Sequence, residues 1–190
     1  MRLSKDLIIS FLILIIIASL YRVIPGRPWG FTPQIAMAIF AGAVVQDKKY
    51  AFLLPLLSMF LSDLLYEMLF RNGIGNIPGF YGGQIMNYIL FASMTVFGFF
   101  VNSRKILSIL FASLAAPTAY FFLSNAVVWL STSPNAGLHR PKTLNGLVLC
   151  IQDGLPFYPG SILGCVVFSS VLFGGHYLFV SRKSVMNYQL

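Results

Sequence analysis

The sequence predicts an all-α, polytopic integral membrane protein, with one domain of six transmembrane helices over residues 1–190. Hydrophobic residues make up 57% of the chain and charged residues only 9%, and the mean hydropathy is +0.80. A soluble domain could not bury so much apolar surface, whereas a membrane protein exposes it to lipid. The lysines and arginines stand singly or in pairs at segment ends, as membrane topology requires. The net charge of +8 therefore does not indicate a nucleic-acid partner.

Six apolar segments are candidate spans, given that about 20 residues cross the hydrocarbon core as a helix. No small-residue cleavage site follows the first segment, so we expect an uncleaved span rather than a signal peptide. The second segment is short, and we expect it to be tilted or partly buried in protein. In chain order, the segments are 7–24, 32–46, 50–70, 84–101, 106–130 and 155–180.

The connections between these spans differ in character. Residues 47–49 (Asp-Lys-Lys) form a tight turn, 72–83 are rich in glycine and proline, and 131–154 form the longest connection. In this last connection, apolar residues at helical spacing predict a short amphipathic helix over 143–153. Such a helix could cap a cavity, or it could lie at the interface and serve packing alone.

The basic residues predict that both termini are cytoplasmic (N-in, C-in), and we expect the protein in the cytoplasmic (inner) membrane. In this orientation, the cytoplasmic side holds Arg2, Lys5, Lys48, Lys49, Arg104, Lys105, Arg182 and Lys183. The outer side holds Arg22, Arg27, Arg71, Arg140 and Lys142.

Three charged residues lie near the outer end of the third span. Asp63, Glu67 and Arg71 are four residues apart, which places them on one helical face. A charge at bilayer depth costs about 2.5–3.5 kcal/mol, so such residues usually face a partner or a water-filled cavity. They are either an internal salt-bridge ladder or the polar wall of a substrate site.

Further polar and aromatic residues fall in the same outer half, and they predict a solute site that opens outward. Converging polar groups between aromatic walls are typical of small-molecule pockets, and the basic rim favours an anion. The tryptophans alone fit an interfacial aromatic belt equally well. The candidate site residues are Arg22, Arg27, Phe31, Gln34, Asp63, Glu67, Arg71, Asn125, Trp129 and Asp153.

Catalytic motifs are absent from the sequence. It contains no H-E-x-x-H, no G-x-S-x-G and no Walker motif. The histidines (139 and 176) and the cysteines (150 and 165) have no metal-ligand spacing. We therefore expect no enzymatic activity, no cofactor and no metal, and any ATP-driven step would require a partner.

Four stretches of the chain together resemble an uncharacterised family of bacterial membrane proteins, a domain of unknown function with a suggested transport role. They are YRVIPGRPWGFTPQIAMAIFAGA (21–43), AFLLPLLSMFLSDL (51–64), FFLSNAVVWL (121–130) and LPF (155–157). More distantly, the layout is similar to the substrate-binding (S) components of energy-coupling-factor (ECF) vitamin transporters, whose biotin-type members share an F-T-x-Q-x-A opening.

The second resemblance implies an S-component-like bundle that captures a vitamin-like molecule or cofactor precursor on the outer side. A membrane coupling subunit and ATPases would then drive release inside. By position, the resemblance implies site roles for Arg22, Phe31, Thr32, Gln34, Asp63, Asn125 and Trp129.

The first span departs from the S-component pattern. S components commonly dock the coupling subunit through A-x-x-x-A in this span, but here it reads LIISFLILIIIASL. Small residues at four-residue spacing occur elsewhere, as Ala38/Gly42, Ala112/Ala116 and Gly160/Gly164. The competing function is a non-catalytic structural or assembly subunit that uses these faces to bind partner proteins.

Overall fold

The computed structural model describes residues 5–133 and 139–187, and within these ranges its secondary structure is helical throughout. The elements are α1 (Lys5–Val23), α2 (Gln34–Val44), α3 (Lys48–Ala51), α4 (Leu53–Arg71), α5 (Gln84–Ser93), α6 (Thr95–Phe99), α7 (Ile106–Ser131), α8 (Leu144–Gly154), the 3-10 turn η1 (Leu155–Phe157) and α9 (Tyr158–Asn187).

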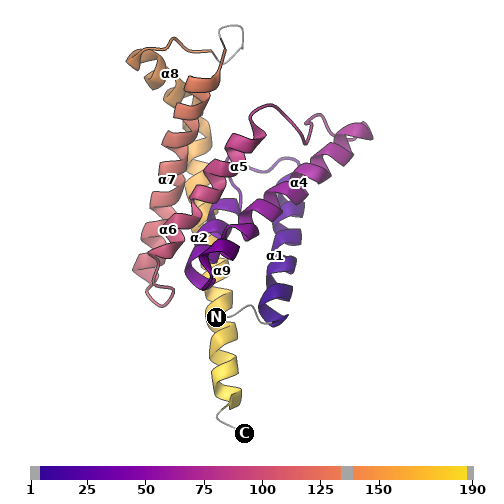
Figure 1. Ribbon diagram of the computed structural model, residues 1–190, viewed down its shortest axis with the longest axis vertical. Helices are drawn as coiled ribbons and strands as arrows, with labels where there is room; N and C mark the ends of the chain where they lie inside the picture. The colour runs from indigo at the N-terminus through magenta and orange to yellow at the C-terminus, as the bar shows by residue number, and fades with distance from the viewer. Residues whose placement is uncertain (1–4, 134–138, 188–190) are drawn as a thin grey trace.

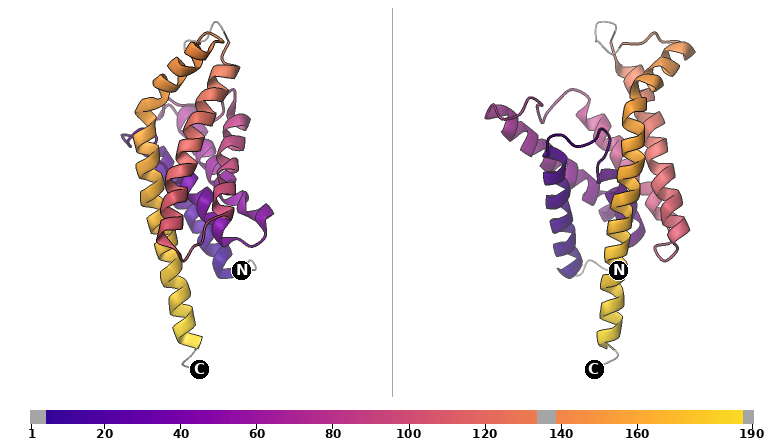
Figure 2. Two further views of the ribbon diagram at one scale, coloured as in Figure 1. Left: turned by 90° about the vertical axis from the view of Figure 1, so that its left-hand side faces the viewer. Right: turned by 180° about the vertical axis from the view of Figure 1, so that it is seen from behind.

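The helices run back and forth between two ends of the molecule (Figure 1). In that view α1 begins and α9 ends at the lower end, whereas α8 lies at the upper end, which we call the α8 end. The views in Figure 2 show α9 alongside α7, with α8 crossing between their upper ends. The connections before α2 and between α4 and α5 also lie at the α8 end.

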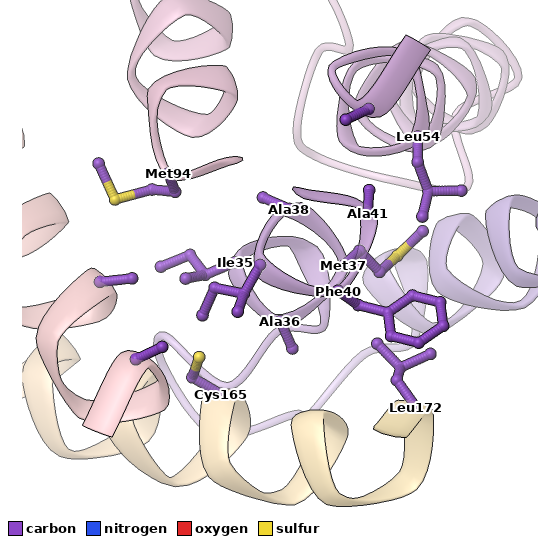
Figure 3. Close-up of a cluster of buried hydrophobic side chains, with 14 of the residues drawn as sticks. Ile35, Ala36, Met37, Ala38, Phe40, Ala41, Leu54, Met94, Cys165 and Leu172 are labelled. Atoms are coloured by element: carbon purple, nitrogen blue, oxygen red, sulfur yellow. The ribbon is translucent and has the colours of Figure 1, made fainter. Parts of the chain in front are cut away.

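Helix α2 is the centre of the core. Residues 34–42 are all buried, and α2 contacts α4, α6, α7 and α9. Figure 3 shows its side chains pointing toward Leu54, Met94, Cys165 and Leu172 on the surrounding helices. The expectation that this short segment is buried in protein is confirmed. At 1.5 Å per residue, α2 is about 16 Å long, roughly half of a hydrocarbon core.

Three helical stretches are long and apolar enough to cross a membrane: Lys48–Arg71, Ile106–Ser131 and Leu144–Leu178. The other apolar stretches, Ile9–Val23, Gln34–Val44 and Gln84–Phe99, are shorter. By length and composition alone, the former three stretches are thus able to span a membrane.

Two expected spans contain breaks with local causes. The third segment divides at Phe52 into α3 and α4, because Pro55 has no N–H to donate to the carbonyl of Ala51. The fourth divides at Met94, where a hydrogen bond to the carbonyl of Phe91 (3.2 Å) marks a tighter, 3-10-like turn. The expected amphipathic helix over 143–153 is confirmed as α8, and Thr143 caps it by accepting from the Gly146 N–H at 3.2 Å.

The small-residue pairs pack inside this chain. A Cβ on Gly98 of α6 would lie 2.8 Å from the Cα of Gly42, so α2 and α6 meet backbone to backbone. A Cβ on Gly164 of α9 would lie 2.9 Å from the Thr32 nitrogen, so α9 makes room for the connection before α2. Ala38, Ala112 and Ala116 belong to the buried core.

Candidate functional site

A cavity of about 640 Å³ lies at the α8 end, enclosed by the ends of α1, α2, α5, α7, α8 and α9. Its walls carry five of the residues expected from the sequence: Arg22, Arg27, Gln34, Asn125 and Asp153. The other lining residues include the aromatic side chains Phe91, Tyr120, Phe121, Phe157 and Tyr158. This volume lies within the range of about 300–1,000 Å³ typical of small-molecule sites.

Gln34 is the first residue of α2 and lies on the cavity wall. Its side chain is 1% exposed, and neither Oε1 nor Nε2 has a hydrogen-bond partner among the described residues. A buried polar group without a partner costs about 1–3 kcal/mol. An amide with both atoms unpaired beside a cavity is therefore suited to receive a bound molecule.

Two arginines supply positive charge to the cavity. Arg27 comes from the connection between α1 and α2 and has no hydrogen bond or ion pair with any described residue. Arg22, on the last turn of α1, uses only Nη1 in the hydrogen bonds that it makes to described residues. Its Nε and Nη2 make no hydrogen bond to a described residue, and Arg22 lines the cavity.

Asp63 anchors Arg22 from outside the cavity. Its side chain is buried, and its Oδ1 accepts from Arg22 Nη1 at 2.6 Å. Its Oδ2 accepts from Gln84 Nε2 at 2.7 Å and from the Tyr88 hydroxyl at 2.6 Å. We call Arg22, Ser62, Asp63, Gln84 and Tyr88 the Asp63 cluster; Ser62 Oγ accepts from Arg22 Nη1 at 2.6 Å. This cluster connects α1, α4 and α5.

Glu67 and Arg71 form a separate pair at the end of α4. Arg71 Nε donates to Glu67 Oε1 at 2.7 Å, and the other oxygen of Glu67 accepts from the Gly79 N–H at 3.1 Å. The Arg71 side chain is 76% exposed, and neither residue lines the cavity. The three charges of α4 therefore do not form one ladder, because Asp63 pairs across to α1.

Helix α8 lies at the edge of the cavity and contacts α7 and the segment before it. Arg140 Nε and Nη2 each donate to one oxygen of Asp153, both at 2.8 Å. These bonds and the Asp153 charge raise the pKa of the Arg140 guanidinium above its usual value, so Arg140 stays charged. The amide of Asn125 packs against Gly154, where a Cβ would lie 2.5 Å from Asn125 Oδ1.

Trp129 and Phe31 lie beside the cavity rather than on its wall. Trp129 Nε1 donates to the Pro141 carbonyl at 2.8 Å, and the ammonium of Lys142 lies 5.6 Å from the ring centroid. These contacts hold the segment before α8. Phe31 packs with Tyr21 and Phe168, at centroid distances of 6.3 and 5.4 Å, where α1 meets α9.

The aromatic wall is the part of the site that the sequence did not predict. Phe91 and Tyr120 lie with ring centroids 4.5 Å apart, and Phe121 and Tyr158 lie 4.8 Å apart. The Tyr120 hydroxyl donates to Asn87 Oδ1 at 2.9 Å, which ties α7 to α5. Phe121 could have been found from its spacing, because it lies one turn before Asn125.

The described residues contain no group of three His, Cys, Asp or Glu side chains placed to hold a metal ion. Cys150 on α8 and Cys165 on α9 are both free, buried thiols. The cavity can therefore offer hydrogen bonds, positive charge and aromatic surface.

The resemblance to an uncharacterised family is confirmed, because the model of a family of unknown function (DUF6580) matches residues 3–187. The comparison with curated proteins finds no match, and neither does the comparison with solved structures. The distant similarity to S components of ECF transporters is thus not confirmed. The chain belongs to DUF6580, a family of unknown function, over nearly its whole length.

Proposed function

We propose that this protein is a membrane transport protein that binds a small, vitamin-like or cofactor-precursor solute from the outer side for uptake. Gln34 is the observation that carries the proposal, because a buried amide without a partner is costly unless it serves a ligand. Arg27, which has no described partner, supports the same conclusion. The residues around the cavity have binding character but lack a nucleophile–base pair or a metal cluster within the described ranges.

In this proposal the chain crosses the membrane six times, with both termini in the cytoplasm and the cavity on the outer side. The three shorter apolar stretches would complete the crossings together with their connections. The alternating helix directions support this topology, since α1 begins and α9 ends at the same end. Exposed apolar side chains on α1, such as Ile13 (51%) and Ile17 (58%), suit contact with lipid.

Uptake against a gradient would require partner subunits. The sequence has no Walker motif, so a membrane coupling subunit and ATPases are the partners that the proposal includes. The proposed location is the bacterial cytoplasmic membrane.

The alternative, a structural or assembly subunit, has less support from the packing. It relied on small-residue faces that would bind partner proteins. In the structure, Gly42 packs against Gly98 and Gly164 packs against Thr32, so these faces are occupied within the chain.

A thermal-shift screen of the purified protein in detergent tests the proposal. The library consists of vitamins, cofactor precursors and modified bases. A molecule that binds only the folded state adds RT ln(1 + [L]/Kd), or about 2.7 kcal/mol at a hundredfold excess over Kd. We expect at least one hit that loses its effect in an Arg27→Gln variant. A library without hits, combined with co-purification of a stable partner complex, would favour the assembly subunit and reject solute binding.

A further inference from the structure

We infer that the ligand of this cavity is a small planar anion that also carries an amide-type edge, with an N–H donor beside a carbonyl acceptor. The inference rests on the proposed solute-binding function and specifies its ligand class. Three features of the cavity carry it: the free amide of Gln34, the two arginines with the uncapped start of α2, and the aromatic wall.

The free amide of Gln34 requires both a donor and an acceptor from the ligand. The nitrogens of the other two amides of the cavity wall already donate hydrogen bonds. Asn87 donates to the Tyr81 hydroxyl at 2.8 Å and accepts from Tyr120 at 2.9 Å. Asn125 Nδ2 donates to the Phe121 carbonyl at 2.7 Å. Because Oε1 and Nε2 of Gln34 are both buried and unpaired, the complementary partner is another amide-type edge, such as a lactam.

The charges around the cavity select an anion. Arg27 is unpaired among the described residues, and Arg22 has Nε and Nη2 available. Asp153 is the acidic residue of the wall, and its two oxygens are already bonded to Arg140.

The N-terminus of α2, which carries the partial positive charge of the helix dipole, lies on the same wall of the cavity. Pro33, its N-cap, makes no side-chain cap hydrogen bond, and Thr32, Gln34 and Ile35 all line the cavity. The N-terminus of a helix favours a negatively charged group through its free N–H groups and its dipole. The ligand's carboxylate or phosphate would thus lie near Arg27 and the start of α2.

Aromatic rings on the wall favour a flat ligand. The rings of Phe91 and Tyr120, and those of Phe121 and Tyr158, come from α5, α7 and α9. Stacked aromatic contacts add about 0.5–1.5 kcal/mol beyond burial of area. A planar ring with an amide edge and an acidic substituent therefore fits all three features.

Four matched probes separate the amide edge from the charge. 6-Oxo-1,6-dihydropyridine-3-carboxylate has both groups, benzoate has the charge alone, 2-pyridone has the lactam edge alone, and benzene has neither. Isothermal titration calorimetry in detergent gives their affinities for the wild-type protein. We expect the lactam acid to bind at least about tenfold more tightly than benzoate or 2-pyridone, because a missing partner leaves a buried polar group unpaired.

Two variants assign the groups to residues. Gln34→Met removes the amide, and we expect it to abolish the preference for the lactam acid over benzoate. Arg27→Gln removes the cavity arginine that is unpaired among the described residues and leaves Arg22, which is paired with Asp63, so we expect it to abolish the preference for the lactam acid over 2-pyridone. The control is Arg104→Gln, which removes the same charge from the connection between α6 and α7, at the end of the molecule opposite α8 (Figure 1), and keeps both preferences.

The outcomes distinguish the ligand class from the function. If the lactam acid does not bind at millimolar concentration, or binds no better than benzoate, the ligand class is wrong. A hit from the wider library that lacks both groups would then leave solute binding intact. Failure of all four probes together with a library without hits would overturn both proposals.

Discussion

The Asp63 cluster and the cavity are two buried polar regions at the same end of the molecule, but their hydrogen bonding differs. Both oxygens of Asp63 have partners, from Arg22 on one side and from Gln84 and Tyr88 on the other. On the cavity wall, the side-chain amide of Gln34 has no hydrogen-bond partner among the described residues. The Asp63 cluster therefore holds α1, α4 and α5 together. The cavity, by contrast, has a buried amide that is not used in hydrogen bonds between the described helices.

Arg22 belongs to both regions, so the cavity depends on the Asp63 cluster for the position of one of its arginines. Arg22 Nη1 donates to Asp63 and to Ser62, each at 2.6 Å, and Arg22 also lines the cavity. The Tyr66 hydroxyl also donates to the Arg22 carbonyl. Asp63 is thus a positioning residue for Arg22, and it would influence binding without touching the ligand.

Breaking the Asp63 cluster should give the largest loss of stability. Asp63→Asn removes the charge that pairs with Arg22, and breaking a buried ion pair costs about 3–5 kcal/mol. We expect a loss near the lower end, since the Arg22 side chain keeps 16% exposure. Reversible unfolding in detergent measures the change in the free energy of unfolding.

Glu67→Gln is the matched control for this prediction, because Glu67 lies one turn further along α4 and pairs with the largely exposed Arg71. We expect it to lower the melting temperature far less than Asp63→Asn does. Equal losses in the two variants would show that the Asp63 cluster is no more structural than the Glu67–Arg71 pair.

The same substitution at two glutamines should have opposite effects on stability. Gln34→Met removes an amide without partners, so we expect the free energy of unfolding to stay the same or to rise. Gln84→Met removes a donor to Asp63 and to the Gly79 carbonyl. We expect it to lower the free energy of unfolding by about 1–3 kcal/mol, since the buried Gly79 carbonyl loses this donor and Asp63 Oδ2 keeps the Tyr88 hydroxyl alone of its two donors. Unfolding curves of the two variants, measured without ligand, make the comparison.

A loss of stability in Gln34→Met as large as that in Gln84→Met would contradict this comparison. Gln34 would then be a packing residue like its neighbours on α2. The wild-type protein should also respond to the lactam acid with a higher melting temperature, while Gln34→Met should respond less.

The helices could be predicted from the sequence, because an apolar run and the proline, glycine or charged residues that end it determine helix boundaries locally. The amphipathic spacing between Leu144 and Ile151 predicted α8, and the short second segment predicted a buried helix. Among the candidate site residues, five were brought to one cavity because the helices alternate in direction and place the ends that carry these residues together at the α8 end.

The pairing of charges did not follow from the sequence, because it depends on how helices pack. Spacing along α4 places Asp63, Glu67 and Arg71 on one helical face, but it cannot show that Asp63 pairs with Arg22 of α1. The tyrosines of the aromatic wall were missed for a related reason. Tyr120 and Tyr158 lie within apolar runs, and only the packing of α7 against α9 turns them to one cavity.

The smallest expected effect concerns the contact between Arg140 and Asp153 at the edge of the cavity. Arg140→Gln leaves the Asp153 carboxylate unneutralised beside the site for the anion. Because both side chains are more than a third exposed, at 38% and 37%, the melting temperature should stay unchanged.

Arg140→Gln should lower the affinity for a negatively charged ligand and leave the affinity for an uncharged ligand unchanged. We expect the affinity for the lactam acid to drop a few-fold in Arg140→Gln, and more at low salt, where charge repulsion is screened less. The affinity for uncharged 2-pyridone should stay the same. Arg71→Gln removes an equal charge from an exposed pair outside the cavity, so it should change neither affinity. An equal loss of affinity for both probes in Arg140→Gln would contradict this prediction. It would mean that the ion pair fixes the position of α8, and that its loss changes the shape of the cavity rather than the charge near the ligand.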